Sequence, residues 1–308
     1  MVILSASRRT DIPAFYADWL LRRFREGWLL VRHPMNPHQL SRVALSPELV
    51  DAIVFWTKDP APMLARLADW EALGIPFLFQ FTLTPYGEAL EPGVRDKRAI
   101  ADTFCRLADK LGPHRVLWRY DPVVLNDSWT VARHEEAFAA LCERLKGYTD
   151  QCTVSFVDLY AGLRGAQRAG LLRVVEADEM ARLAASFARE GGRAAIAVRA
   201  CCEAMDLRPF GVEPASCIDR KRLEALCGCS LRGGRASGQR PGCGCMDSVD
   251  VGAYGTCRHG CVYCYAARSG VPPHDPASPL LSGWPEEDDR ILERRMAPLR
   301  DGQTSLFG

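Results

Sequence analysis

The chain has 308 residues, of which 48% are hydrophobic and 25% charged, enough for one large globular domain or two smaller ones. Its formal net charge of +1 argues against a broad nucleic-acid-binding surface and leaves only a local basic patch open. No apolar signal-peptide segment opens the sequence, and no apolar run approaches the roughly 18 residues of a membrane helix, so we expect a cytoplasmic protein with no membrane partner.

Over the first two hundred residues, short apolar runs alternate with longer amphipathic segments. This alternation is typical of βαβ units around a parallel sheet. The predicted strands are residues 2–6, 52–56, 77–83, 116–120, 153–157 and 195–199. The predicted helices are residues 14–27, 61–73, 96–111, 131–146 and 176–190, and a hairpin with arms at 29–32 and 40–45 is expected within 28–50. Six units favour an α/β fold of the (βα)6 partial TIM-type barrel class, with a doubly wound sheet as the alternative.

Polar residues follow each predicted strand, and parallel βα folds carry their active sites at that end of the sheet. The competing explanation is that these residues are polar only because the ends of strands are exposed to solvent. Gln80 lies within an apolar run, and Arg119 and Arg199 follow apolar strands, so each is expected to need a buried partner. We therefore predict a polar pocket that accepts anions. The candidate catalytic residues are Arg8, Arg9, Asp11, Lys58, Gln80, Arg119, Asp121, Arg199 and Glu203, and the candidate cofactor-binding residues include Thr57 and Ser155.

The strand–helix alternation ends after Glu203, where a cysteine-rich segment begins. We place the barrel at residues 1–203, the cysteine-rich metal-binding segment at 204–271 and a tail at 272–308. Residues 220–226 are expected to form at most a short helix, and residues 232–240, rich in Gly, Arg and Ser, a flexible loop. In the tail we expect an amphipathic helix over 286–297 and disorder in the last ten residues.

Three cysteines close to the end of that segment form a CxxxCxxC motif, with Tyr263 directly before the last one. Cys257, Cys261 and Cys264 are the triad. Thiolates are the usual ligands of iron–sulfur clusters, so three of them predict a 4Fe–4S cluster with one open iron that can bind a substrate or cofactor. Tyr263 is a candidate cofactor-binding residue, whereas His259 is expected to form a hydrogen bond or face solvent rather than bind metal.

Most of the thirteen cysteines lie between residues 201 and 264, and without a secretory signal they favour metal binding over a disulfide scaffold. A possible second metal site comprises Cys202, Cys217, Cys243 and Cys245. Zinc and a second iron–sulfur cluster both remain candidates there, although zinc sites usually contain CxxC rather than CxC. Three other cysteines are expected to be small buried core residues, and Cys201 or Cys202 has the same alternative. They are Cys105, Cys142 and Cys152.

The cysteine spacing and its flanking tyrosine resemble those of radical S-adenosylmethionine (SAM) enzymes, most closely the spore photoproduct lyase branch. Over nearly its full length, the chain resembles the prokaryotic family of domain of unknown function 1848, which looks like a radical-SAM relative with its cluster motif at the C-terminus. The matching signatures are Ser-Ala-Ser-Arg-Arg-Thr-Asp-Ile-Pro at 5–13, Asn-Pro at 36–37, Val-Phe-Trp-Thr-Lys-Asp-Pro at 54–60, Gln-Phe-Thr-Leu-Thr-Pro-Tyr at 80–86, Arg-Tyr-Asp-Pro at 119–122, Cys-Ile-Asp at 217–219, Gln-Arg at 239–240 and the final Gly-Ala-Tyr-Gly-Thr-Cys. Ordinary radical-SAM barrels differ, since their cysteine loop follows strand one and a Gly-Gly-Glu follows strand two.

The resemblance implies an enzyme in which SAM, bound at the open iron, is cleaved reductively to act on a small polar or anionic substrate. The arginines of the predicted pocket would bind a carboxylate or a phosphate group. An electron donor such as flavodoxin or ferredoxin would be its partner. Two alternatives remain: a lyase-type enzyme of nucleic-acid lesion repair, which needs a basic groove, and a non-catalytic iron–sulfur redox or sensor protein, which needs four protein ligands and no pocket. We expect the triad to lie over the carboxyl ends of the strands, close to Arg119 and Arg199.

Overall fold

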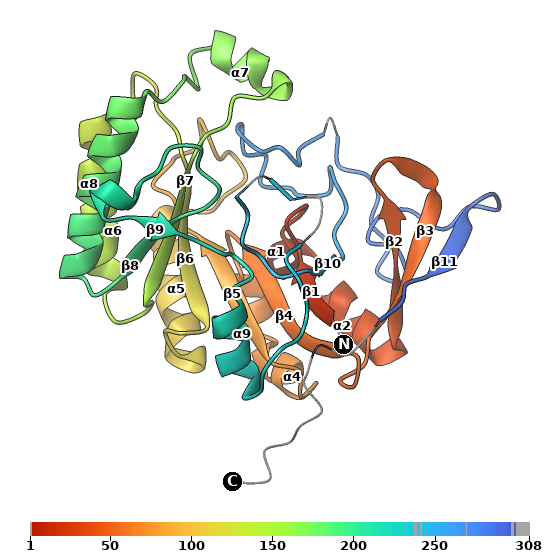
Figure 1. The fold of residues 1–308 in the computed structure, drawn as a ribbon. Helices are drawn as coiled ribbons and strands as arrows, with labels where there is room; N and C mark the ends of the chain where they lie inside the picture. The colour runs from red at the N-terminus through yellow and green to blue at the C-terminus, as the bar shows by residue number, and fades with distance from the viewer. Residues whose placement is uncertain (1, 237–238, 241, 269, 297–298, 300–308) are drawn as a thin grey trace, which may run out of the picture.

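The computed structural model describes residues 2–236, 239–240, 242–268, 270–296 and 299. Its main element is a sheet of eight parallel strands in the order β10-β1-β4-β5-β6-β7-β8-β9 (Figure 1). The strands are β1 (Val2–Ala6), β4 (Val50–Thr57), β5 (Phe77–Thr82), β6 (Val116–Val123), β7 (Gln151–Phe156), β8 (Ala197–Ala200), β9 (Glu213–Pro214) and β10 (Val249–Asp250). All six strands predicted from the sequence are present, and the cysteine-rich segment adds one short strand at each edge.

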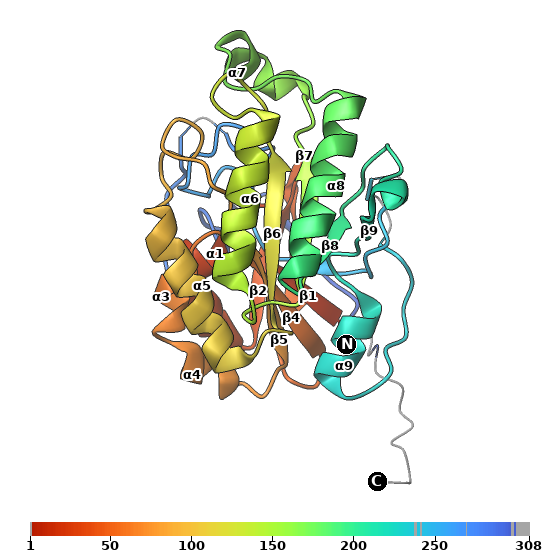
Figure 2. The same cartoon turned by 90° about the vertical axis from the view of Figure 1, so that its left-hand side faces the viewer.

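The helices pack mainly on one face of this sheet. They are α1 (Ile12–Phe15), α2 (Ala17–Glu26), α3 (Ala61–Leu64), α4 (Leu67–Glu71), α5 (Lys97–Leu111), α6 (Val131–Leu145), α7 (Arg164–Arg168), α8 (Ala177–Arg193) and α9 (Arg220–Cys227). Each of the first two predicted helices is in fact a pair of short helices. From β1 to β8 the neighbouring strands follow chain order, so right-handed crossovers put the connecting helices on the same face. Figure 2 looks onto that face, with α5, α6 and α8 in front of the strands. The doubly wound alternative is therefore wrong, because it requires a reversal of strand order.

Both faces of the sheet are buried, as expected for parallel strands. Successive side chains point to opposite faces. Leu4, Ile53 and Phe79 belong to the core beneath the helices. The alternate residues Val54 and Leu117 belong to a second core, formed with α9 and the cysteine-rich segment. That segment is thus the cover of the second sheet face rather than a separate appendage, and its position depends on the strands below it.

A smaller sheet lies beside the main one and contains β2 (Trp28–His33), β3 (Asn36–Ala44) and β11 (Arg290–Glu293). The predicted hairpin is present as β2 and β3. The helix expected within 286–297 is wrong, because residues 290–293 instead pair in parallel with the free edge of β3. Arg32 reinforces this pairing through ion pairs of 2.6 and 2.8 Å to Asp289. Of the last ten residues, for which disorder is predicted, all but Leu299 lie outside the described residues.

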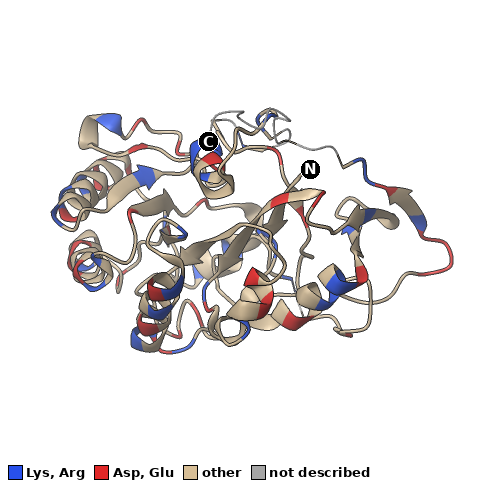
Figure 3. Cartoon of the chain, turned by 90° about the horizontal axis from the view of Figure 1, so that it is seen from below, with Lys and Arg blue, Asp and Glu red and all other residues tan. Residues whose placement is uncertain are grey.

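The described helices give no indication of a membrane span, since none is long and apolar enough to cross a bilayer. Charges are mixed along them. Figure 3 shows Lys and Arg interspersed with Asp and Glu on the helices at the underside of the molecule. This distribution agrees with the near-zero net charge and lends no support to a broad basic surface.

Candidate active site

A cavity of about 720 Å³ opens at the carboxyl ends of the parallel strands. It has the size of a small-molecule site, for which roughly 300–1,000 Å³ is usual. The loops after β1, β4, β6 and β7 form one part of its wall, and the cysteine-rich segment forms the rest. The predicted site residues that line it, apart from cysteines, are Arg8, Arg9, Asp11, Thr57, Lys58, Arg119, Asp121, Ser155 and Tyr263.

Three predicted site residues do not line this cavity. Arg199 is exposed and lines a smaller hollow with Glu213, so the expectation of a buried Arg199 near the triad is wrong. Its side chain lies on the sheet face opposite Val198 and Ala200, which is also the face of Arg119, but β8 is close to the edge of the sheet and only the two-residue β9 lies beyond it. Gln80 is fully buried behind the cavity wall, where its amide donates to the Cys217 carbonyl at 2.7 Å. Glu203 accepts a hydrogen bond from the Phe156 amide, and burial raises its pKa to about 7.

Arg119 has the partners that its burial requires. Its guanidinium donates to Cys217 Sγ at 2.9 Å and forms an ion pair with Asp121, which also accepts a hydrogen bond from Ser155. The same guanidinium lies 5.1 Å from the ring centroid of Trp56. A buried cation with these partners stays charged, and it gives this side of the cavity a fixed positive group.

The other two arginines follow β1 and are held through β10. The Arg8 guanidinium stacks on the Trp56 ring at 5.0 Å from its centroid, and that of Arg9 stacks on Tyr254 at 5.3 Å. Asp250 of β10 accepts hydrogen bonds from the hydroxyls of Ser5 and Ser7 and from the Arg8 amide, at 2.7–2.9 Å. The sequence prediction missed Asp250, because its short Val-Asp-Val run gave no clear strand pattern.

Asp11 joins the loop after β1 to the cysteine motif. Its carboxylate accepts a hydrogen bond from the Lys58 amide at 2.7 Å and lies 2.8 Å from His259 Nε2. It also caps α1 through the Ala14 amide. His259 is buried and has its second ring nitrogen 3.3 Å from the Gly93 carbonyl, so the expected hydrogen-bonding role is confirmed.

The loop after β5 holds the motif from the other side. Glu91 accepts hydrogen bonds from Tyr263 and Thr84 and forms ion pairs with Lys58 and Lys97. Burial raises the pKa of Glu91, but the two ammonium groups outweigh it and hold the pKa at about 2. Sequence reasoning missed Glu91, since it lies in a loop without any strand or helix pattern. A carboxylate this well paired fixes both Lys58 and the ring of Tyr263.

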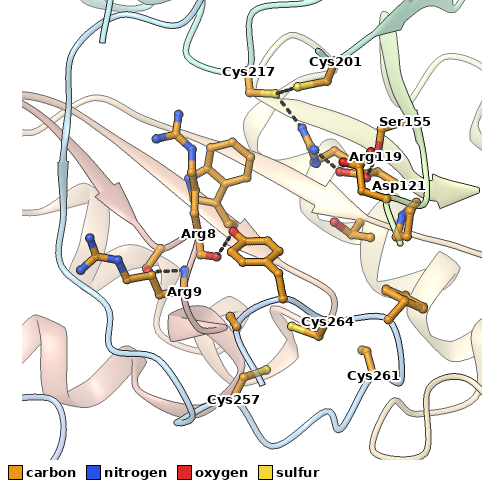
Figure 4. Close-up of a pocket in the computed structure, with 18 of the residues that line it drawn as sticks. Arg8, Arg9, Arg119, Asp121, Ser155, Cys201, Cys217, Cys257, Cys261 and Cys264 are labelled. Carbon is orange, nitrogen blue, oxygen red and sulfur yellow. Dashed lines mark hydrogen bonds and ion pairs between the residues drawn. The ribbon is translucent and has the colours of Figure 1, made fainter. Parts of the chain in front are cut away.

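The triad lies beside Arg119 at the carboxyl ends of the strands, as the sequence predicted, but Arg199 does not line the same cavity. Cys257, Cys261 and Cys264 all line the cavity that Arg119 lines, although they are more than 130 residues away from it in the chain. Figure 4 shows them together at the lower side of the pocket. Burial raises the pKa of Cys257 to about 12 and that of Cys261 to about 11. These thiols would have to lose protons to bind a metal, as cysteine ligands generally do.

A second thiol group, which we call the facing thiols, lies on the far wall of the same cavity (Figure 4). Its sulfur atoms are separated by 3.3 Å between Cys201 and Cys217 and by 3.9 Å between Cys201 and Cys202. Hydrogen bonds from Cys201 and Cys245, together with the Arg119 guanidinium, hold the pKa of Cys217 well below its usual range. The members are Cys201, Cys202, Cys217, Cys243 and Cys245. The predicted grouping of Cys202, Cys217, Cys243 and Cys245 is thus present, and Cys201 is an addition to it.

The arrangement of the cysteine side chains restricts how they could bind a metal. Within the described ranges, no group of three or more His, Cys, Asp or Glu side chains is arranged to hold a single metal ion. No disulfide bond joins any of the thirteen cysteines, all of which lie within the described residues. As predicted, Cys105, Cys142 and Cys152 are buried in the core beneath the helices, far from solvent.

Comparison with known proteins identifies the family but no characterised relative. The search of curated proteins found no match. One family model, described as a domain of unknown function (DUF1848), matches residues 3–266. This range includes both thiol groups and every other predicted site residue. Because this model covers most of the chain, including its parallel sheet and its cysteine-lined cavity, the chain belongs to the DUF1848 family.

Proposed function

We propose that this protein is a radical-SAM-like iron–sulfur enzyme that acts on a small polar or anionic substrate. The observation that carries the proposal is the presence of the triad and of four cationic side chains around one cavity at the carboxyl ends of the strands. A site with thiolate ligands, fixed positive charge and room for a small molecule has the parts that such chemistry needs. The cations are Arg8, Arg9, Lys58 and Arg119.

We also infer a (βα)6 partial barrel, and the place of β10 supports it. β10 pairs in parallel with β1 at the edge of the sheet, and the cysteine loop follows it directly. Radical-SAM barrels have their cysteine loop after the first strand, as the resemblance implies. Here an edge strand from the far end of the chain takes that position, which explains how a C-terminal motif comes to lie over the barrel mouth.

The residues present fit the cofactor. The motif supplies three thiols, and its one histidine, His259, is engaged with Asp11 and Gly93 rather than with the cavity. In a cubane each thiolate binds a different iron, so its sulfur atoms surround one common centre at a larger distance than the ligands of a single ion do. When bound at the triad, a 4Fe–4S cluster with an open iron supplies one-electron reductive cleavage of SAM.

Among the four cations of the cavity, Arg8 is the one that the described part of the chain leaves without a carboxylate partner, since Arg9 lies 3.9 Å from Asp250. Lys58 is engaged with Glu91, and Arg119 with Asp121. Arg8 has no carboxylate partner among the described residues, and its stacking on Trp56 orients the planar guanidinium. Guanidinium groups recognise carboxylates in a bidentate manner. We therefore assign Arg8 to a carboxylate of SAM or of the substrate.

The cavity also favours an enzyme over a redox carrier or sensor, because a carrier needs no enclosed space beside its cluster. The test is anaerobic reconstitution with iron and sulfide, followed by dithionite and SAM. We expect release of methionine and 5′-deoxyadenosine, which requires one electron and one hydrogen atom per SAM. Cys261→Ala should abolish the release and lower the iron content, whereas Cys105→Ala, in the distant core, should do neither. An intact cluster without SAM cleavage would support the carrier instead.

A further inference from the structure

The facing thiols come from three separate segments that the fold brings together. Cys201 and Cys202 directly follow β8, Cys217 follows β9, and the last two thiols belong to the Cys-Gly-Cys at 243–245. The strands β8 and β9 pair in parallel at the edge of the main sheet. Their pairing brings Cys201 and Cys217 together at the carboxyl ends of two neighbouring strands, where both line the cavity.

The distance between Cys201 and Cys217 suits a dithiol pair that can form a disulfide bond. Their sulfur atoms lie 3.3 Å apart, and a disulfide bond is about 2.05 Å long, so an approach of about 1 Å would join them. Neighbouring strands lie about 4.8 Å apart, within the range of Cα separations of roughly 4.4–6.8 Å that a disulfide spans. Sulfur atoms this close are nearer to each other than thiolates that bind different irons of one cluster.

The surroundings of the two thiols assign a different role to each. Arg119, which is itself buried, donates to Cys217 Sγ at 2.9 Å, and a guanidinium beside a sulfur atom favours the thiolate over the thiol. The thiolate is the nucleophile of thiol–disulfide exchange, so Cys217 is the attacking residue. Cys201, in contact with the Cys217 sulfur, is then the resolving residue that completes the exchange.

Two further observations favour this pair over other pairs in the group. Cys245 also contacts Cys217, but it is buried more deeply than Cys201 and accepts a hydrogen bond from the Ile218 amide at 3.4 Å. Cys202, directly after Cys201, has a left-handed backbone with φ of 56°, which is costly for a residue with a Cβ. Backbone strain of this kind is concentrated at functional sites, which supports a reactive role for this turn.

We propose that Cys201 and Cys217 are a redox-active pair that undergoes thiol–disulfide exchange with a small disulfide in the cavity. The Cys217 thiolate attacks one sulfur of the small disulfide, forms a mixed disulfide and expels one small thiolate. Cys201 then attacks Cys217 Sγ, closes the protein disulfide and expels the second thiolate. Two electrons pass from the pair to the small disulfide, and the proton of Cys201 goes to a leaving thiolate. The inference goes beyond the proposed function, because this exchange needs neither a metal nor SAM.

The test uses the full-length protein, purified without oxygen and without added metal, and cystine as the small disulfide. We expect a disulfide between Cys201 and Cys217, located by peptide mapping after alkylation of the remaining thiols, with two molecules of free cysteine released for each such bond. Cys201→Ser should instead stop at a mixed disulfide between Cys217 and cysteine. Cys229→Ser, which changes a cysteine outside both thiol groups, should react like the parent. Circular dichroism confirms that each variant is folded.

The proposal is overturned if cystine leaves Cys217 open to alkylation, or if the new disulfide joins another pair of facing thiols, such as Cys202 with Cys243. Zinc or iron that the purified parent binds and that Cys217→Ser loses would overturn it as well, because these thiols would then be metal ligands. The test of the triad requires iron, sulfide and SAM. The dithiol pair and the proposed function therefore succeed or fail in separate samples.

Discussion

At the scale of single residues, the site depends on a few side chains that each hold more than one part of it. Asp11 contacts the Lys58 amide, the His259 ring and the start of α1. Glu91 similarly binds two lysines and Tyr263. Because such carboxylates are buried and fully engaged, their loss leaves several donors without partners, which costs far more than the loss of one surface hydrogen bond.

Arg8→Gln should weaken SAM binding without affecting the cluster. The variant removes the guanidinium that has no carboxylate partner among the described residues, and charge-assisted hydrogen bonds contribute about 1.5–3 kcal/mol, so we expect a roughly 10- to 100-fold higher Kd. Arg42→Gln is the matched control, since Arg42 also stacks on a tryptophan but lies in the smaller sheet. Isothermal titration of the reconstituted protein measures the Kd. An unchanged Kd for Arg8→Gln would show that this residue does not contact SAM.

His134 should make the protein less stable in acid. Burial lowers its pKa to about 4, and its ring lies between the Tyr120 hydroxyl and the Val124 carbonyl. Between pH 6.5 and 4 the unfolded chain binds a proton that the folded chain refuses, so the free energy of unfolding falls as the pH falls, by up to about 3 kcal/mol. Urea unfolding at several pH values measures this fall. A His134→Gln variant should show a shallower dependence than a variant of the exposed His114.

At the scale of elements, the cysteine motif is held by loops rather than by a strand or helix of its own. The loop after β5 donates from the Gly93 amide to the His259 carbonyl at 2.8 Å and accepts from the Val262 amide at 3.0 Å. On the other side, the Tyr16 hydroxyl donates to the Thr256 carbonyl. The backbone of the motif is therefore fixed independently of its thiols.

Gly93→Ala should displace the triad loop. An added Cβ would lie 2.5 Å from the Arg258 carbonyl oxygen and 2.8 Å from that of His259, both of them backbone atoms. Relieving such overlap costs about 1–3 kcal/mol in stability, and we expect lower iron content at the triad. Gly87→Ala, where a Cβ meets nothing within 4 Å, is the control from the same loop. Equal iron content in the two variants would contradict a role for this close approach.

At the scale of the whole molecule, the cysteine-rich segment covers one sheet face and carries the triad together with three of the five facing thiols. Its apolar residues Ile218, Leu223 and Met246 pack against the strands. Its short strands β9 and β10 extend the sheet at its two edges. We therefore expect the metal binding proposed for this segment to stabilise the sheet as well as the loops.

We expect reconstituted protein to melt at a higher temperature than metal-free protein, because a ligand bound only by the folded state adds to its stability. Hydrogen exchange, measured on the reconstituted and the metal-free protein, locates the residues that become more stable. Protection should increase in residues 201–264 and change little in α5, α6 and α8, which pack on the opposite face. Equal protection throughout, with and without iron and sulfide, would argue against metal binding in this segment.

The sequence alone was enough to predict the strands, the longer helices and the triad. Phe77–Thr82 and Lys97–Leu111 were predictable because their apolar residues repeat with strand and helix periods. The grouping of Cys257, Cys261 and Cys264 was predictable because the three cysteines are close together in the sequence. The burial of Arg119 followed from the apolar strand before it.

Only the tertiary structure decided which of these parts meet. Several parts of the site depend on contacts between segments far apart in the chain. They are the short strand β10, the place of Cys201 among the facing thiols, and the contacts of the Asp250 and Glu91 carboxylates. A two-residue strand has no periodic pattern, and its pairing is selected by the free edge of β1. Likewise Arg199 and β11 differ from prediction because the exposure of Arg199 near the edge of the main sheet and the pairing partner of β11 are properties of the assembled sheets, not of their local sequence.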